Sequence, residues 1–373
     1  MNGVSIIICC YNSAKRLEPT LRAIRQLALP PQVKAELILI DNNSTDDTVA
    51  LARSCWAQAP APFPLRTISE LRQGQSYARL RGTAAASYGT ILFVDDDNEL
   101  RHDYVETGLR ILERHPDVGV LGGMSQGVFK SPLPGWIHPG FPFKSLLNSL
   151  AVTTSDTSAP GYLDYESSFV MGAASFYRKS IFDKLRAHRY ELKLAGRQGD
   201  ILMSGDDQEL CMLAKMMGYR IYRSGELHFK HHIDCSRLRR DYFKRLFYGF
   251  GYGSLTLKSY GICLRENKSM LGIAIISQNA KDKIRLLKLL RLAFLPFGAK
   301  AFKLDLLIEY QRGLLRFLAE HPDFMATHGE IARLSCLLAV SDEKAAHKAP
   351  PAATSLESWA PLGGRAAASS SWS

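Results

Sequence analysis

Short apolar runs alternate with helical patterns through the N-terminal half of the chain. Near-continuous apolar runs of strand length cover residues 4–10, 36–40, 65–69, 90–94, 118–124, 170–176 and 218–229. Between them, apolar side chains recur at helical spacing over residues 15–29, 45–58, 75–87, 102–115 and 206–217. This alternation predicts an α/β fold, with a mostly parallel sheet covered by helices on both faces.

The pattern changes after residue 236, where helical spacing continues without strands to about residue 340. We therefore expect an α/β domain over 1–236, a basic helical C-terminal extension over 237–344, and a disordered Ala/Pro/Ser-rich tail over 345–373. Gly249, Gly251 and Gly253 form a GxGxG run in the extension. The run follows a helical segment, whereas a dinucleotide fingerprint follows a strand, so we interpret it as a flexible hinge.

Polar residues follow the ends of three predicted strands, at Tyr11-Asn12, at 41–44 and at 95–98. Ligands of such sheets bind beyond the carboxyl ends of the strands, so these clusters predict one site. Asp95, Asp96 and Asp97 repel one another unless a cation offsets their charge. Alternate residues of an extended chain share a side, so Asp95 and Asp97 can converge on Mg²⁺ or Mn²⁺. The alternative is a polar turn after a strand.

Positive charge is concentrated in the C-terminal extension. The net charge is +11, and residues 237–303 hold 15 Lys and Arg against three acidic residues. Such a segment predicts an anionic partner. Residues 284–297 resemble a basic amphipathic helix of the kind that lies in a membrane interface, and the alternative is a helix that only packs on the rest of the protein.

The chain shows no signal of secretion or of membrane spanning. No stretch reaches 18 uncharged apolar residues, so no transmembrane helix is expected. The seven cysteines lack CxxC spacing, and nothing at the N-terminus resembles a secretory signal. We expect reduced thiols and a cytoplasmic location, with peripheral attachment to the inner face of the membrane as a further expectation from the basic helix.

Several motifs together resemble those of family 2 glycosyltransferases with the GT-A fold. They are SIIICCYN at 5–12, DNNSTDDT at 41–48, GQSYARLRG at 74–82, the acidic triplet at 95–97, GAASF at 172–176 and GDDQEL at 205–210. They occur in the family's order and cover roughly residues 4–260. The resemblance implies a Rossmann-like GT-A domain and metal-dependent, inverting transfer of a sugar from a UDP-, GDP- or dTDP-sugar.

The resemblance also assigns roles to individual residues. Asp207 would be the general base beside Asp206, and the metal ligands would be Asp95, Asp97 and His231, the last from an HxxHH cluster. The nucleotide-sugar would be bound by Cys10, Tyr11, Asn12, Asp41, Asn43, Arg79, Asp95 and Asp96. In detail, Asp41 would contact the base or ribose, Tyr11 would stack near the base and Asp96 would contact the ribose. Asp206 stands where the family usually has Glu, and Cys9-Cys10 replace a Pro and a small polar residue.

Other functions remain open from the sequence. A nucleotidyltransferase also uses aspartate-bound metal, but it usually carries a Gly-rich basic loop after the first strand, unlike Tyr11-Asn12-Ser13. A catalytically weak glycosyltransferase-like binding protein would have lost its acids, which are all present here. Basic and aromatic residues at 239–248 superficially fit a nucleic-acid module, but we prefer a helix over the active site and expect no nucleic acid. The acceptor is expected to be a saccharide or a lipid-linked molecule of polysaccharide or glycolipid synthesis.

Overall fold

A computed structural model describes residues 3–58, 60–137, 144–153, 159–163, 169–196, 202–264, 273–294 and 298–346. From residue 347 on, the tail expected to be disordered lies outside these residues. The strands are β1 (Gly3–Cys10), β2 (Lys34–Asp41), β3 (Leu65–Ser69), β4 (Thr90–Val94), β5 (Asn98–Leu100), β6 (Val118–Phe129), β7 (Gly161–Tyr162), β8 (Ser175–Arg178) and β9 (Arg220–Ile233). The helices are α1 (Leu17–Arg25), α2 (Thr48–Ala57), α3 (Gln75–Ala85), α4 (Tyr104–Arg114), α5 (Lys144–Asn148), α6 (Lys179–Ala187), α7 (Asp206–Met216), α8 (Arg240–Leu264), α9 (Ile273–Ala293), α10 (Gly298–Glu320) and α11 (Phe324–Ala346). Two short 3₁₀ helices, η1 (Gly135–Ile137) and η2 (Cys235–Leu238), complete the described elements.

The strands form one sheet in the order β3-β2-β1-β4-β8-β6-β9-β5, and β7 pairs with β9. The longer ladders, β1 with β2 and β4, β2 with β3, and β6 with β9, are parallel. The short strands β5, β7 and β8 run antiparallel to their neighbours. The predicted α/β fold with a mostly parallel sheet is therefore confirmed.

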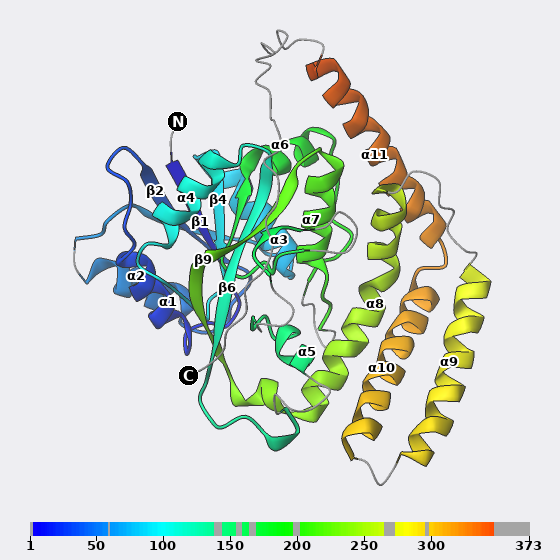
Figure 1. Cartoon of the computed structure of the whole chain (residues 1–373). Coiled ribbons are helices and arrows are strands. Elements are labelled where there is room, and N and C mark those ends of the chain that lie inside the picture. Colours follow the sequence, from blue (N-terminus) through cyan, green and yellow to red (C-terminus); the bar gives the residue numbers. More distant parts are fainter. Residues whose placement is uncertain are drawn as a thin grey trace, which may run out of the picture.

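Alternation along the central strands supplies two hydrophobic cores. In β1, Ile6 and Ile8 face a core that includes residues of α1, α2 and α4. Ile7, between them, faces a second core built with α3, α6 and α7. Figure 1 shows these two helical layers on either side of the sheet. The sheet is buried on both faces, which explains why its strands read as continuous apolar runs.

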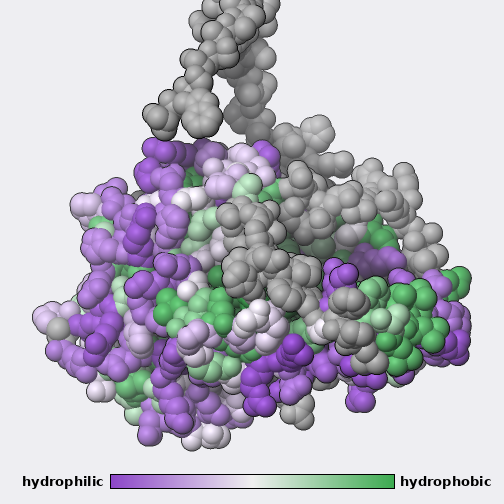
Figure 2. All heavy atoms as spheres, turned by 60° about the horizontal axis from the view of Figure 1, so that its bottom comes forward, coloured by the Kyte–Doolittle hydropathy of each residue, from purple (hydrophilic) through white to green (hydrophobic). Residues whose placement is uncertain are grey.

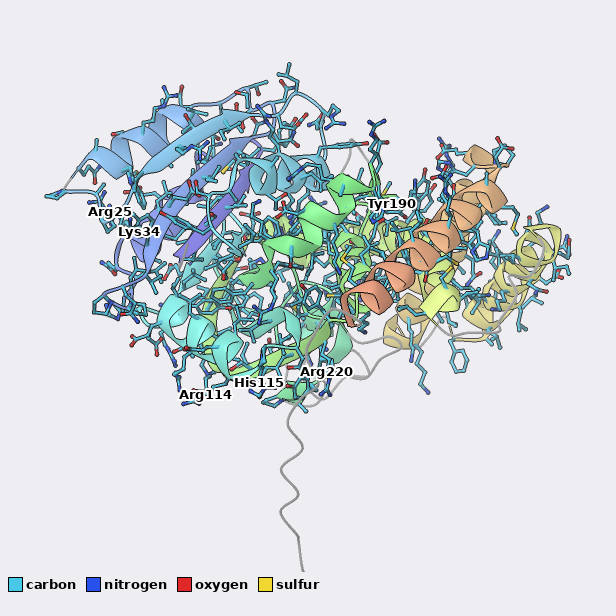
Figure 3. The ribbon with its side chains drawn as sticks, turned by 90° about the horizontal axis from the view of Figure 1, so that it is seen from above. Arg25, Lys34, Arg114, His115, Tyr190 and Arg220 are labelled. Atoms are coloured by element: carbon cyan, nitrogen blue, oxygen red, sulfur yellow. The ribbon has the colours of Figure 1, made fainter. Side chains whose placement is uncertain are left out.

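The C-terminal helices α8 to α11 pack beside α7 and away from β1–β3 (Figures 1 and 3). Helix α8 contacts α7, α10 and α11, and α10 in turn contacts α9. Tyr260 of α8 and Ile331 of α11 enter the core on the α7 side of the sheet. Within the described residues, none of the helices combines the length and the apolarity needed to cross a membrane.

The GxGxG run is not a hinge, which corrects the expectation from the sequence. Gly249, Gly251 and Gly253 all lie inside the continuous helix α8. A Cβ on Gly249 would lie 1.9 Å from the carbonyl oxygen of Leu202, and one on Gly251 would lie 1.8 Å from that of Tyr310. The glycines are therefore packing positions at which the backbone before α7 and helix α10 approach α8 closely.

A second difference concerns residues 170–176, which were expected to form a strand. Strand β8 begins only at Ser175, because the preceding Ala174 has a positive φ of 52° and breaks the extended conformation. The backbone at Gly172 instead approaches Arg79 and Asp207. This loop therefore belongs to the wall of the site described next.

Candidate active site

A cleft of about 1460 Å³ opens at the carboxyl ends of β1 and β4. Its walls include Cys10 and Tyr11 at the end of β1, the acidic triplet after β4, and Asp206 and Asp207 of α7. The expected convergence of these motifs is therefore found in the structure. On the other side the cleft extends along α8 and α10, which the sequence motifs did not include.

The acidic triplet turns directly after β4. Asp95 lines the cleft, and its backbone N–H donates to Asn98 Oδ1 over 3.1 Å. Burial, together with the nearby charges of Asp97 and Asp207, raises the pKa of Asp95 to about 6, while the charge of Arg79 opposes the shift. The ionised acids are therefore mutually unfavourable in the absence of more positive charge.

Asp96 is held by the β1–α1 loop. Its carboxylate accepts hydrogen bonds from Ser13 Oγ and from Arg16 Nε, the latter over 2.9 Å. Arg16 Nη2 also lies 2.7 Å from Asp96 Oδ2. Arg16 lines the cleft, so this contact presents a cation close to the predicted ribose ligand. The sequence analysis missed Arg16, because no motif pairs it with an acid 80 residues away.

Asp97 meets His231 and Arg237 because β5 pairs with β9. Asn98 is opposite His231, and the backbone N–H of His232 donates to the carbonyl oxygen of Asp97 over 2.9 Å. Asp97 Oδ1 lies 3.3 Å from His231 Nε2, and Asp97 Oδ2 lies 3.1 Å from Arg237 Nη2. Two of the predicted metal ligands are thus adjacent, and a guanidinium contacts the carboxylate.

The chemistry of this donor set fits a divalent ion. Among the described residues, no three His, Cys, Asp or Glu side chains are gathered in the manner of a closed metal centre. Mg²⁺ and related ions do not require one, since they are typically held by one or two carboxylates together with substrate phosphates. Asp97 and the adjacent imidazole of His231 supply such a partial set, and Asp95 lines the same open cleft.

The two acids at the start of α7 share one buried arginine. Arg79 Nη1 lies 2.9 Å from Asp206 Oδ2 and 2.5 Å from Asp207 Oδ1. Both acids line the cleft, and the side chain of Asp207 is 28% exposed against 10% for Asp206, so Asp207 is the more accessible of the two. Burial raises the pKa of Asp206 to about 7, and the charge of Asp207 adds to the shift. Arg79 is therefore a partner of the candidate base, and its contact with a nucleotide stays a prediction.

The nucleotide-side residues are arranged by side-chain contacts between loops. Asn12 Oδ1 accepts from the backbone N–H of Thr45 over 2.8 Å, and Asp41 Oδ1 accepts from that of Ser44 over 3.0 Å. Of the predicted set at this end, Cys10 and Tyr11 line the cleft, whereas Asn12, Asp41 and Asn43 are not among its described lining residues. Asn12 and Asp41 instead order the loop at Ser44 and Thr45 through these hydrogen bonds.

Asn42, which the sequence analysis passed over, lines the cleft and fixes the loop that precedes α3. Its Nδ2 donates to the carbonyl oxygens of Glu70 and Arg72 over 2.9 and 2.7 Å. Its Oδ1 accepts from the backbone N–H of Gly74 over 2.8 Å. The buried amide therefore satisfies three backbone groups and sets where α3, with Arg79, begins.

The far half of the cleft is apolar. Beyond Asp207 its walls include Leu246, Phe247 and Phe250 of α8, and Leu307 and Tyr310 of α10. Lys258 and Gln311 add polar groups to this part. The cleft thus joins an acidic end at the sheet to a largely hydrophobic end between helices.

Comparison with known proteins identifies the N-terminal segment. Residues 5–186 match the model of the family described as glycosyl transferase family 2. Over this segment the chain is similar to glycosyl transferase family 2. The family 2 segment contains β1 to β8, the acidic triplet and Arg79, and the resemblance inferred from the motifs is confirmed.

Individual relatives match this chain over limited lengths. The poly-β-1,6-N-acetyl-D-glucosamine synthase of Staphylococcus epidermidis is 24% identical over 138 residues, which are 37% of this chain and 32% of that protein. Glycosyltransferase AglE of Haloferax volcanii is 29% identical over 120 residues, which are 32% of this chain and 38% of that protein. The chain thus spans about a third of the length of these curated relatives.

Among solved structures, the mannosyltransferase PcManGT from Pyrobaculum calidifontis, in complex with GDP-Man and Mn²⁺, is similar with a TM-score of 0.50. The two proteins are 16% identical, and the match covers 91% of this chain and 86% of that chain. At this identity the likeness establishes a shared fold, the GT-A fold of a glycosyltransferase.

Proposed function

We propose that this protein is a metal-dependent inverting glycosyltransferase that moves a sugar from a nucleotide-sugar donor to a saccharide or lipid-linked acceptor. One observation carries the proposal: Asp207, part-exposed and held by a buried arginine, faces the same cleft as the acidic triplet. Asp207 with its arginine suits a general base, and the acidic triplet suits a diphosphate with its cation. Glycosyl transfer requires both a base and a cation-bound diphosphate, and the groups suited to each line one cleft.

The base is supplied by this chain. Asp207 would take the proton of the attacking hydroxyl group as that oxygen bonds to the anomeric carbon. Arg79 orients the carboxylate through its Nη1 contact and offsets its charge in the buried wall. A single base with attack opposite to the leaving group inverts the anomeric configuration.

The donor would lie over the ends of β1 and β4. Tyr11, which is 46% exposed, offers a ring for the nucleobase, and Asp95 and Asp97 mark the diphosphate end. A divalent ion held by Asp97, Asp95 and His231 would act as a Lewis acid that neutralises the departing diphosphate. The similar mannosyltransferase contains Mn²⁺ and GDP-Man, which supports Mn²⁺ or Mg²⁺ and a nucleotide-sugar as the first candidates.

The acceptor would extend from Asp207 into the apolar half of the cleft. Phe247, Phe250 and Leu307 would contact a hydrophobic body better than a chain of hydroxyl groups. We therefore favour an acceptor whose sugar or hydroxyl head is carried on a lipid, as in polysaccharide or glycolipid assembly. The similarity to a polysaccharide synthase over part of the chain supports the same choice.

The exposed side of α9 supports a position at a membrane surface. Leu286, Leu289 and Leu292 are 57–65% exposed, and Lys288 lies among them. Figure 2 shows a hydrophobic patch at the right of the molecule, over the ends of α9 and α10. We propose peripheral attachment to an anionic leaflet on the cytoplasmic side, where a lipid-linked acceptor is found.

A donor screen tests the proposal directly. UDP-, GDP- and dTDP-sugars would be incubated with the protein and Mn²⁺, and hydrolysis and thermal stabilisation would be measured. We expect one nucleotide class to stabilise the fold only with metal, and slow release of its sugar. Nucleotide binding without any hydrolysis or transfer would favour a binding protein, and pyrophosphate release from nucleoside triphosphates would favour a nucleotidyltransferase.

Two variants assign the roles within the site. Asp97→Ala is expected to abolish metal-dependent nucleotide binding, whereas the surface change Asp183→Ala leaves it intact. Asp207→Asn should retain donor binding and lower kcat by about 10²–10⁴-fold, the usual contribution of a positioned base. Normal turnover by Asp207→Asn together with an inactive Asp206→Asn would reverse the assignment of the two acids.

A further inference from the structure

The contact of Arg237 with Asp97 is not explained by the roles assigned so far. Arg237 lies in η2, between the end of β9 and the start of α8, and it lines the cleft. Its backbone N–H donates to the carbonyl oxygen of Asp234 over 2.9 Å, and Asp234 Oδ1 accepts from the N–H of Ser236 over the same distance. The turn is thus fixed by its own hydrogen bonds, and it holds Arg237 over the acidic triplet.

Arg237 contacts both of the adjacent predicted metal ligands. Nη2 lies 3.1 Å from Asp97 Oδ2, and Nη1 lies 3.5 Å from His231 Nε2. His231 Nε2 also lies 3.3 Å from Asp97 Oδ1, and His231 Nδ1 lies 3.4 Å from the carbonyl oxygen of Ala151. The guanidinium of Arg237 thus offsets the negative charge of Asp97 at the point where Asp97 adjoins the imidazole.

Arg237 stays positively charged at any ordinary pH, because a guanidinium does not lose its proton in proteins. When a metal cation binds Asp97, the guanidinium therefore needs another anionic partner. Its planar fork matches phosphate oxygens as well as carboxylate oxygens. Arg237 is 17% exposed toward the cleft, so a diphosphate at the acidic triplet lies beside its present partner. The same side chain can therefore serve the empty and the donor-bound site.

We propose that Arg237 is a diphosphate-binding residue that rests on Asp97 and His231 and moves to the donor diphosphate when a divalent ion takes these two ligands. The inference rests on the proposed function. It assigns Arg237 to stabilising the negative charge that develops on the departing diphosphate. It also predicts that Arg237 and the metal ion compete for Asp97, so that metal alone binds weakly and metal with nucleotide binds well.

Binding measurements separate this exchange from a merely structural ion pair. Titration calorimetry would use MnCl₂ alone, and then UDP, GDP, dTDP and the matching monophosphate at saturating Mn²⁺. In Arg237→Gln, Mn²⁺ alone should bind about tenfold more tightly, since its competitor is absent. The nucleoside diphosphate should bind about 10- to 100-fold more weakly, the usual effect of losing a charge-assisted contact, and the monophosphate should change less.

Arg239→Gln is the matched control, because it removes the same charge two residues along from an exposed position outside the cleft lining. It should bind Mn²⁺ and nucleotides as the unchanged protein does, and Arg237→Lys should recover part of the diphosphate affinity. Thermal melts would verify that each variant is folded. If the unchanged protein binds a diphosphate and Arg237→Gln binds it and Mn²⁺ equally well, the inference is wrong. If no nucleoside diphosphate binds the unchanged protein, the proposed function fails first.

Discussion

At the scale of single residues, Gly172 is where the backbone comes nearest to the candidate base. A Cβ at this position would lie 1.9 Å from Asp207 Oδ1 and 2.5 Å from Arg79 Nη2. Neither distance is tolerable, so a side chain here must displace the carboxylate or the guanidinium. Glycine is therefore required here by the space that Asp207 and Arg79 occupy, and not by a positive backbone φ.

Gly172→Ala should therefore impair catalysis more than folding. The end of Asp207 can rotate away at small cost, which leaves the fold intact but moves the base by an ångström or more. We expect kcat to fall roughly 10²-fold, with the melting temperature and donor affinity close to their original values. Gly89→Ala is the control, since a Cβ there meets nothing within 4 Å. Equal activity of the two variants would show that Asp207 is not positioned through this contact.

At the scale of elements, Glu209 joins α7 to α8 and to the loop before α7. Its carboxylate accepts from the backbone N–H groups of Lys193 and Leu194, over 2.6 and 2.9 Å, and from Tyr260 Oη over 2.5 Å. Tyr260 in turn contacts Tyr190 Oη over 2.7 Å, and Figure 3 shows Tyr190 between the sheet domain and the C-terminal helices. This buried network ties the helix of the candidate base to the extension.

Glu209 should make stability depend on pH. Burial raises its pKa from 4.5 to about 7, against the three hydrogen bonds, while the charge of Asp206 adds to the rise. The folded state then holds a proton that the unfolded chain releases, so this stabilisation is complete below pH 4.5 and is lost as pH rises through 7. The contribution of this protonation to the free energy of unfolding is about 3 kcal/mol at most.

Urea unfolding of the unchanged protein and of Glu209→Gln between pH 4.5 and 8 measures this effect. The amide lacks the titration, so the difference in unfolding free energy between the two proteins should narrow as pH rises. Glu330→Gln, at an exposed partner of Lys193, is the control and should give a constant difference. A constant difference for Glu209→Gln as well would mean that Glu209 is ionised throughout.

The packing of α8 against α10 yields an opposite pair of predictions for two glycines of one helix. Helix propensity alone favours alanine over glycine by up to about 1 kcal/mol. At Gly251, however, a Cβ would collide with the backbone of Tyr310, whereas at Gly261 it would meet nothing within 4 Å. Gly251→Ala should destabilise the fold by about 1–3 kcal/mol, and Gly261→Ala should stabilise it slightly. Chemical denaturation of both variants tests this, and stabilisation by Gly251→Ala would contradict the close helix contact.

At the scale of the whole molecule, charge and exposed apolar surface meet on α9. Arg291, one of the cations of the predicted amphipathic helix over 284–297, pairs with Asp305 of α10. Ile276 and Ala280 are buried in a hydrophobic cluster that includes Phe317 of α10, so one side of α9 is internal. The cations that remain on its exposed side include Lys281 and Lys288. The packing alternative thus holds for one face of this helix, and the membrane alternative stays a prediction for the other face.

Liposome co-sedimentation tests the membrane proposal. Binding should appear with vesicles rich in anionic lipid, fall with added salt, and weaken in Lys281→Glu/Lys288→Glu, since each cation near such a surface contributes about 1 kcal/mol. The control Lys34→Glu/Arg114→Glu makes the same change in net charge on the sheet domain, away from α9 (Figure 3). Protein that stays in the supernatant at low salt, or equal loss in both variants, would exclude α9 as the membrane contact.

The sequence by itself determined the sheet domain and the acids of the site. Strands such as β1 and β4 are buried on both faces, so their apolar runs are local signals, and β3 was predicted at its observed bounds. Because parallel strands end at one edge, the placement of Asp95 and Asp207 in one cleft also followed from local patterns. The triplet and the motif of Asp207 could therefore be found without coordinates.

The tertiary structure decided what these residues contact. Asp97 meets Arg237 only because β5 pairs with β9, and Arg79 meets Asp207 across 128 residues of sequence. Gly251 was read as a hinge because glycine has the same local signal whether it permits motion or close packing. The partners of a charged residue and the contacts of a glycine depend on which distant segments pair in the fold. A single sequence contains no local pattern that reveals this pairing. Only the fold could therefore show that Arg237 stands beside the predicted metal ligands.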